Sequence, residues 1–273
     1  VLNPAFVGSK SDLNATLLTR QQWLNVEGAP ETTTFSVNTR LNSGFGLGAT
    51  VVSDQLGLID NTDVNLDVSY TIPTSEYGRL SLGIKGGTAF FTNDLADGIT
   101  VDNEVYASTS GDYGNLGLGM LYSTKDYYVG LSAQNLFTSP VFELQDDIQT
   151  FEGLEGSNYF LTGGMAIELS RFNDIVFSTS AMVKYSPTLP LSIDVNANFI
   201  FNGNFEAGVS YRLQNSLSAM VAVILNEKFR IGYAYENYMN GTGQNLNSHE
   251  IILRIDLDLK RNRRWIYQDC CYF

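Results

Sequence analysis

The sequence predicts an all-β protein, a single closed antiparallel transmembrane β-barrel of about 14 strands. Three observations predict it: alternating apolar and polar residues, the length of the alternating segments, and the composition. The alternation is clearest in residues 64–72, 191–199, 205–214 and 251–259, where every second residue is apolar. A period of two places the apolar side chains on one face of a strand.

The composition favours an outer-membrane barrel. Only 16% of the 273 residues are charged, below the roughly 25% that is typical of soluble domains. The chain contains 15 Tyr, 16 Phe and 25 Gly, and such a composition is typical of outer-membrane barrels. A secreted β-sandwich is the alternative. No run approaches about 18 apolar residues, so a transmembrane helix is not expected.

Segment length separates the barrel from the sandwich. The alternating segments are about ten residues long or more, which matches a tilted strand that crosses the hydrocarbon layer. Sandwich strands average about five or six residues. We therefore predict strands over residues 11–23, 33–41, 44–54, 60–72, 77–91, 112–123, 125–137, 156–170, 174–186, 190–201, 204–214, 216–226, 228–238 and 247–260.

The links between these segments predict the orientation of the barrel. Every second link is short, as at residues 42–43, 123–125 and 202–204, whereas residues 92–111 and 138–156 form long polar links. Short periplasmic turns opposite long extracellular loops are typical of outer-membrane barrels. Links 186–188 and 214–216 are short exceptions on the long-loop side. With an even number of strands, both termini are expected in the periplasm.

We expect one domain over residues 1–273. Residues 1–10 precede the first strand, and residues 261–273 form a basic, aromatic periplasmic tail that contains the adjacent Cys270 and Cys271. Adjacent cysteines cannot staple a fold, and their state stays open. Because the sequence starts within what resembles a motif, we expect that residues upstream of it were processed.

The polar positions of the strands are expected to face the lumen. They carry charges of both signs, which predicts salt bridges across the lumen rather than a selective ion pore. Glycines within the strands indicate bends or close approaches. The expected lumenal charges are Arg20, Arg40, Asp67, Arg79, Lys85, Glu168, Lys184, Asp194, Glu206, Arg212, Arg230, Glu236, Arg254, Asp256 and Asp258.

The sequence offers no catalytic set and no cofactor or metal site. His249 is the single histidine, and its neighbour Ser248 would point to the opposite face of the strand, so the two cannot form a nucleophile–base pair. The acidic links at 94–104 and 143–155 do not match an EF-hand loop, and calcium binding there stays open. A net charge of -13 argues against nucleic acid as a partner.

The most distinctive motifs lie near the N-terminus, and weaker ones follow along nearly the whole chain. They are Asn3-Pro4-Ala5, Gly8-Ser9, Arg20-Gln21-Gln22-Trp23, Gly28-Ala29-Pro30, Thr32–Thr34, Gly46-Leu47-Gly48, Asp54, Gly57, Leu80–Gly83 and Ser248-His249-Glu250-Ile251. Together these motifs resemble the PorP/SprF family of Bacteroidetes outer-membrane proteins.

The resemblance implies a non-enzymatic function in the cell outer membrane. Family members are tied to type IX secretion and gliding motility, and several accompany very large secreted adhesins. The implied partners are the C-terminal domain of an adhesin, components of the secretion or gliding machinery, and outer-membrane lipid. Which adhesin, the stoichiometry, and whether a loop or a partner fills the lumen stay open. A transport barrel for small hydrophobic molecules is the alternative.

We expect the motif residues to form a rim element. Trp23 shares the parity of Leu13 and Leu17 and would face the outer membrane interface. Arg20 and Gln22 would face the lumen and pin the Gly28–Pro30 loop, or a partner strand, across the barrel mouth. His249 and Glu250 would close the last loop at the rim. The predicted partner or rim residues are Asn3, Pro4, Arg20, Gln21, Gln22, Trp23, Gly28, Pro30, His249 and Glu250.

Overall fold

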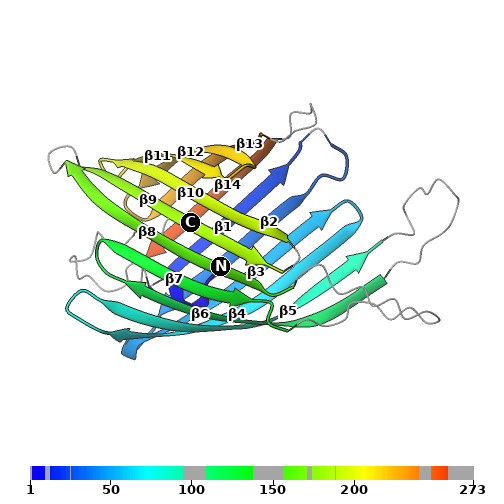
Figure 1. Cartoon of the computed structure of the whole chain (residues 1–273), viewed down its shortest axis with the longest axis horizontal. Helices are drawn as coiled ribbons and strands as arrows, with labels where there is room; N and C mark the ends of the chain where they lie inside the picture. The colour runs from blue at the N-terminus through cyan, green and yellow to red at the C-terminus, as the bar shows by residue number, and fades with distance from the viewer. Residues whose placement is uncertain are drawn as a thin grey trace, which may run out of the picture.

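A computed structural model describes residues 2–9, 13–24, 26–94, 109–137, 156–170, 174–187, 189–239 and 247–257. These residues form fourteen antiparallel strands that close into one barrel (Figure 1). The predicted fold class is confirmed. The strands are β1 (Leu13–Gln22), β2 (Glu31–Arg40), β3 (Phe45–Leu56), β4 (Ile59–Pro73), β5 (Arg79–Asn93), β6 (Thr109–Ser123), β7 (Tyr127–Gln134), β8 (Asn158–Ser170), β9 (Ile175–Ser186), β10 (Leu189–Phe201), β11 (Phe205–Arg212), β12 (Ser216–Leu225), β13 (Phe229–Tyr238) and β14 (Asn247–Leu257).

Closure joins the first strand to the last. β1 pairs with β14 from Leu13↔Leu257 to Gln22↔Ser248, and every other strand pairs with its sequence neighbours. Closure satisfies the backbone groups of both edge strands, which lipid cannot do. The described residues also form two short 3-10 helices, η1 (Pro4–Phe6) and η2 (Asn42–Gly44). No helix in the described part of the chain is long and apolar enough to span a membrane.

The alternation separates the two faces of the wall as expected. The apolar side chains of β4 and β11 face outward and are exposed, with Leu66 at 64% and Val209 at 55%. The lumenal side chains of the same sheet are buried and polar: Ser69 is 1% exposed, and Asn198 is 2% exposed. The barrel therefore has an apolar exterior and a polar interior, the arrangement that a lipid bilayer requires.

The predicted short links are confirmed at one end of the barrel, whereas the long links 92–111 and 138–156 lie mostly outside the described residues. The links that follow β2, β4, β6, β8, β10 and β12 lie at this end and are all short; β1 also begins there and β14 ends there. We call it the short-turn end and the opposite end the long-loop end. Besides the predicted short links 186–188 and 214–216, the long-loop end has another short link, in which only Gly57 and Leu58 join β3 to β4.

The predicted salt bridges across the lumen are wrong in their direction. Arg212 on β11 binds Asp194 on β10, Arg230 on β13 binds Glu206 on β11, and Lys85 on β5 lies near Asp67 on β4. These pairs thus run along the wall, between strands one or two places apart, and Arg254 pairs with Asp256 within β14. Facing positions on neighbouring strands are about 5 Å apart, which is within the reach of a side chain.

Some predicted features lie outside the described residues. These are Asp258, the tail 261–273 with Cys270 and Cys271, and the acidic residues of the two long links except Asp94. Among the described residues, no cluster of histidine, cysteine and acidic side chains could hold a metal ion.

Candidate functional site

The predicted rim residues Arg20 and Gln22 lie on the lumenal face of β1 near the long-loop end. Arg20 forms ion pairs with Glu250, its register partner on β14, and with Glu236 on β13. Its guanidinium also donates to Tyr238 Oη at 3.0 Å, and that hydroxyl donates to Gln22 Oε1 at 3.0 Å. Three strands that meet at the closure of the barrel are thereby joined by side chains.

This network continues to the neighbouring wall. Ser216 on β12 donates to Glu236 Oε1 at 2.5 Å, and Arg212 Nη1 lies 3.9 Å from the same oxygen. Arg212 also forms a two-bond pair with Asp194, at 2.7 and 3.1 Å. Along this network the charges alternate in sign, in the spatial order Asp194, Arg212, Glu236, Arg20 and Glu250. Glu236 is only 6% exposed, and these partners offset the cost of burying a charge there.

Of the other motif residues on these strands, Gln21 and His249 face outward. Gln21 and His249 are register partners on β1 and β14, on the opposite face from Arg20 and Glu250. His249 Nδ1 lies 2.7 Å from Tyr233 Oη, and its ring meets Tyr235 edge-on at 5.3 Å. Ser248 is fully buried on the lumenal side. The expected separation of Ser248 from His249 is confirmed.

The parity argument for an outward Trp23 does not hold, because this residue lies beyond the end of the strand. β1 ends at Gln22, and Trp23 adopts a left-handed backbone with φ of 49°, so the parity of the strand no longer applies to it. Its backbone N–H donates to Asn247 O at 2.7 Å. The indole Nε1 is buried without a hydrogen-bond partner in the described structure. The strand period therefore does not determine where this side chain points.

The loop after Trp23 is held by backbone bonds rather than by Arg20. Gln22 N donates to Pro30 O at 2.9 Å, and Gly57 N donates to Gly28 O at 3.0 Å. Gly28 has a φ of 72°, which favours glycine. The side chain of Arg20 instead binds the wall on its other side. The predicted pin across the mouth is therefore replaced by a contact between the β1–β2 and β3–β4 links.

Asn3 and Pro4 do not lie at the rim but inside the barrel. Residues 2–9 form a segment, here called the lumenal segment, whose single turn η1 contacts β4, β5 and β6. Asn3 is 4% exposed and Ala5 is fully buried. Asn3 Nδ2 donates to Met120 O at 3.2 Å and to Leu131 O at 3.1 Å, while its Oδ1 accepts from Ala5 N at 2.9 Å.

A row of small residues across five strands receives the lumenal segment. The strand registers align Gly46, Ser69, Gly83, Gly119 and Ser132 from β3 to β7. A Cβ at Gly46 would collide with Val7, one at Gly83 with Pro4 and Ala5, and one at Gly119 with Asn3. The two serines bind the backbone: Ser69 Oγ donates to Val7 O at 2.6 Å, and Ser132 Oγ donates to Leu2 O at 2.9 Å.

Sequence reasoning indicated a close approach at these glycines but not what approaches them. The available signal was a set of strand glycines on lumenal positions, which lose side-chain packing unless another backbone occupies the space. The structure shows that backbone to be the lumenal segment. The Asn3 and Arg20 motifs are therefore separate elements on different parts of the wall. A cavity of about 260 Å³ touches both Leu2 and Arg20.

A closed barrel with an apolar exterior and a polar lumen is the architecture of a bacterial outer-membrane protein. Within this class, the chain belongs to the PorP/SprF family, described as type IX secretion system membrane proteins, whose family model matches residues 1–255. The resemblance to the PorP/SprF family is thereby confirmed. The chain is an outer-membrane protein of the type IX secretion system.

Solved structures share the fold. The chain is similar to the outer membrane protein Omp33 of Acinetobacter baumannii, with a TM-score of 0.57 and 5% identity over 92% of this chain and 100% of that one. It is similar to the toluene transporter TbuX of Ralstonia pickettii, with a TM-score of 0.53 and 12% identity over 93% and 92%. The monoaromatic hydrocarbon channel CymD gives 0.53 and 14% over 93% and 90%. No curated protein matched the sequence.

Proposed function

We propose that this barrel is a non-enzymatic anchor in the outer membrane. It binds the C-terminal domain of a type IX-secreted surface protein, a large adhesin, and links it to the secretion or gliding machinery. The observation that carries the proposal is membership of the PorP/SprF family over residues 1–255. The proposed orientation is the one predicted from the links: the long loops are extracellular, and the short turns and both termini are periplasmic.

The geometry of the long-loop end supports the anchoring role. Ion pairs and hydrogen bonds cross-link β1, β13 and β14 at this end of the barrel. They involve the motif residues Arg20 and Gln22 together with Glu236 and Glu250. When the side chains of a binding surface are already held in place, few of them become ordered as a partner binds. Binding therefore costs less conformational entropy. In this role the Arg20 network, the Gly28–Pro30 loop and the outward pair Gln21 and His249 support a docked partner at the rim.

A transport barrel for small hydrophobic molecules is the second candidate. The fold is shared with TbuX and CymD, and the lumenal cavity includes apolar side chains such as Leu2, Met182 and Met220. The charged and polar side chains of the same cavity, among them Asp194 and Asn196, work against a hydrocarbon ligand. The lumenal segment also occupies part of any path through the barrel.

Site-directed photo-crosslinking in native cells tests the anchor. A crosslinking residue replaces Glu31, which is exposed at the long-loop end, or Lys125, which is exposed at the short-turn end as the matched control. We expect the first position to capture a large secreted surface protein and the second to capture none. Capture of no surface protein from any long-loop position, with loss of hydrocarbon uptake on deletion, would favour the transporter.

A further inference from the structure

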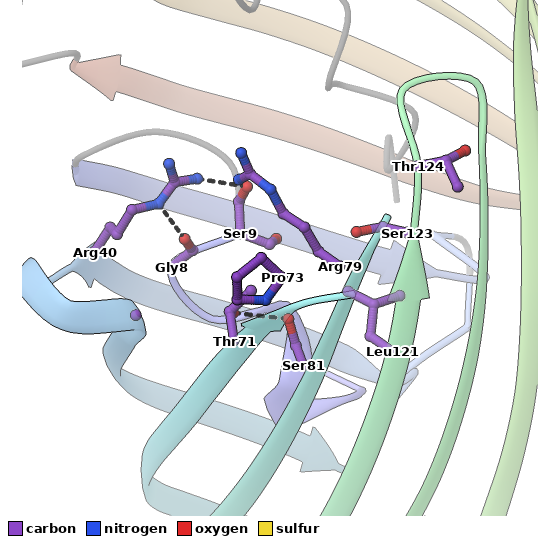
Figure 2. Close-up of a pocket in the computed structure, with 11 residues that line it drawn as sticks. Gly8, Ser9, Arg40, Thr71, Pro73, Arg79, Ser81, Leu121, Ser123 and Thr124 are labelled. Atoms are coloured by element: carbon purple, nitrogen blue, oxygen red, sulfur yellow. Dashed lines mark hydrogen bonds between the residues drawn. The ribbon is translucent and has the colours of Figure 1, made fainter. Parts of the chain in front are cut away.

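Two cavities of about 260 Å³ each lie in the lumen. One is at the short-turn end, where Arg40 donates to the carbonyl groups of Gly8 and Ser9, each at 2.7 Å (Figure 2). The lumenal segment thus already uses Arg40 for its own docking. The other cavity, here called the serine cavity, lies toward the long-loop end, with Arg20 and Glu250 in its lining. Its four lining serines are Ser180, Ser210, Ser216 and Ser218.

A row of neutral polar side chains crosses one wall of the serine cavity. The strand registers align one residue from each of β9, β10, β11 and β12, namely Ser180, Asn196, Ser210 and Ser218. All four line the cavity. Neighbouring strands lie about 4.8 Å apart, so two or three of these side chains can contact one small molecule at the same time.

These side chains retain hydrogen-bonding capacity. Asn196 Nδ2 donates to Ser180 Oγ at 3.2 Å, whereas Asn196 Oδ1 has no partner among the described residues. The hydroxyls of Ser210 and Ser218 likewise have none in the part of the chain that the structure describes. Asn196 is only 8% exposed, and polar groups buried to this extent are usually hydrogen-bonded. The row therefore presents one amide acceptor and several hydroxyls to a ligand in the cavity.

The charged side chains of the serine cavity neutralise one another. Both oxygens of Asp194 accept from Arg212, at 2.7 and 3.1 Å. The two oxygens of Glu236 accept from Ser216 and from Arg20. An ionic ligand would therefore enter without a counter-charge of its own, and burying an unpaired charge is costly. The cavity favours a neutral ligand.

Apolar side chains complete the lining. Leu2, Met182 and Met220 supply C–H surface beside the polar row, and methionine adapts its shape to what it contacts. A volume of about 260 Å³ is below the roughly 300–1,000 Å³ of sites for drug-sized molecules, so the ligand is small. A sugar ring fits this combination, because its hydroxyl groups both donate and accept hydrogen bonds while its C–H groups are apolar.

The wall of the serine cavity differs from the wall that holds the lumenal segment. There, Gly46, Gly83 and Gly119 let a backbone lie directly against the strands. The polar row of the serine cavity contains no glycine, so its side chains project between the wall and any backbone. A compact ligand that meets the tips of these side chains is therefore favoured over a polypeptide.

We propose that the serine cavity binds one neutral sugar ring, either as a free sugar or as the end unit of a glycan chain. A ring hydroxyl donates to Asn196 Oδ1, others exchange hydrogen bonds with Ser210 and Ser218, and the C–H groups of the ring contact Met182 and Met220. The inference goes beyond the proposed adhesin anchor and does not depend on it.

Saturation-transfer NMR of the full chain, in a detergent without a sugar headgroup, tests the proposal. The probes are the methyl glycosides of glucose, galactose and mannose, with acetyl-alanyl-alanine amide as a small neutral peptide. We expect saturation transfer to at least one glycoside, and its titration gives a dissociation constant. Ser210→Ala and Ser218→Ala should each raise that constant by about 5-fold, the usual effect of losing one neutral hydrogen bond. The double substitution should raise it by about 25-fold.

Ser178→Ala is the matched control. Ser178 is also a lumenal serine of β9, 2% exposed, but it lies outside the lining of the serine cavity. This variant should bind the glycoside as tightly as the wild type. Each preparation is checked for folding by its heat-modifiable mobility in gels. If the double variant does not fold, the two single variants provide the comparison.

The proposal is overturned if the wild-type barrel gives no saturation transfer to any glycoside, if Ser210→Ala and Ser218→Ala leave the dissociation constant unchanged, or if Ser178→Ala raises it equally. Stronger binding of acetyl-alanyl-alanine amide than of every glycoside would assign the cavity to a peptide instead. A linear oligosaccharide of the bound sugar separates the two sources. Competition by it supports the end unit of a glycan chain, and failure to compete supports a free sugar.

Discussion

Replacing Asn3 with alanine should release the lumenal segment from the wall while leaving the barrel closed. Asn3 is 4% exposed and forms three hydrogen bonds, two to strand carbonyls of Met120 and Leu131 and one from Ala5 N. At about 1 kcal/mol of net stabilisation per bond, their loss weakens docking of the segment by about 3 kcal/mol. Because 1.36 kcal/mol corresponds to a factor of ten, the open form becomes roughly 100-fold more populated.

Hydrogen exchange measured by mass spectrometry reports this opening. Amides of residues 2–9 should exchange roughly 100-fold faster in Asn3→Ala, since local opening controls their exchange, while amides of β10 and β11 keep their rates. Asn196→Ala is the matched control, because Asn196 is also a buried lumenal amide, 8% exposed, but bonds to Ser180 instead of the segment. Unchanged exchange in Asn3→Ala, or an equal rise in Asn196→Ala, would refute this reasoning.

Two further substitutions test the remaining parts of the structure. Gly83→Val should displace the lumenal segment, because its side chain would overlap Pro4 and Ala5, and should raise single-channel conductance in planar bilayers. Gly86→Val on the same strand, where an added Cβ has open space, should leave conductance unchanged; equal conductance in both variants would contradict the docking. Arg20→Ala should lower the free energy of unfolding in urea by about 2–3 kcal/mol, because it removes the short ion pair of the buried Glu236 and leaves only Arg212, 3.9 Å away, to compensate that charge. Lys125→Ala, which removes an exposed pair with Asp126, should cost less than about 0.5 kcal/mol; similar losses in the two variants would argue against a structural network at Arg20.

Much of the barrel could be predicted because its wall is built from local alternation. The predicted segment 190–201 corresponds to β10 (Leu189–Phe201), and its lumenal residues Asp194, Asn196 and Asn198 are all buried as expected. Where the backbone leaves the strand geometry, the same reasoning fails. Trp23 is one residue beyond β1, and its positive φ removes it from the strand period.

The candidate site was only partly predictable because it depends on register. Arg20 and Gln22 were correctly placed on the lumenal face, but their partners are far along the chain. Glu236 and Glu250 lie 216 and 230 residues from Arg20, and only the closure of β1 against β14 brings them together. Alternation states which face a side chain occupies and not which strand lies beside it.

The sequence by itself determined the class of wall: strands with an apolar and a polar face, long enough to cross a membrane, whose edges must close because lipid offers no hydrogen bonds. The tertiary structure decided what occupies the lumen that this wall encloses. Gly46, Gly83 and Gly119 are scattered in the sequence, and only the pairing of β3 to β6 aligns them into the row that receives Asn3–Val7. Strand period is a local property of neighbouring residues, whereas register and docking join residues that are distant in the chain.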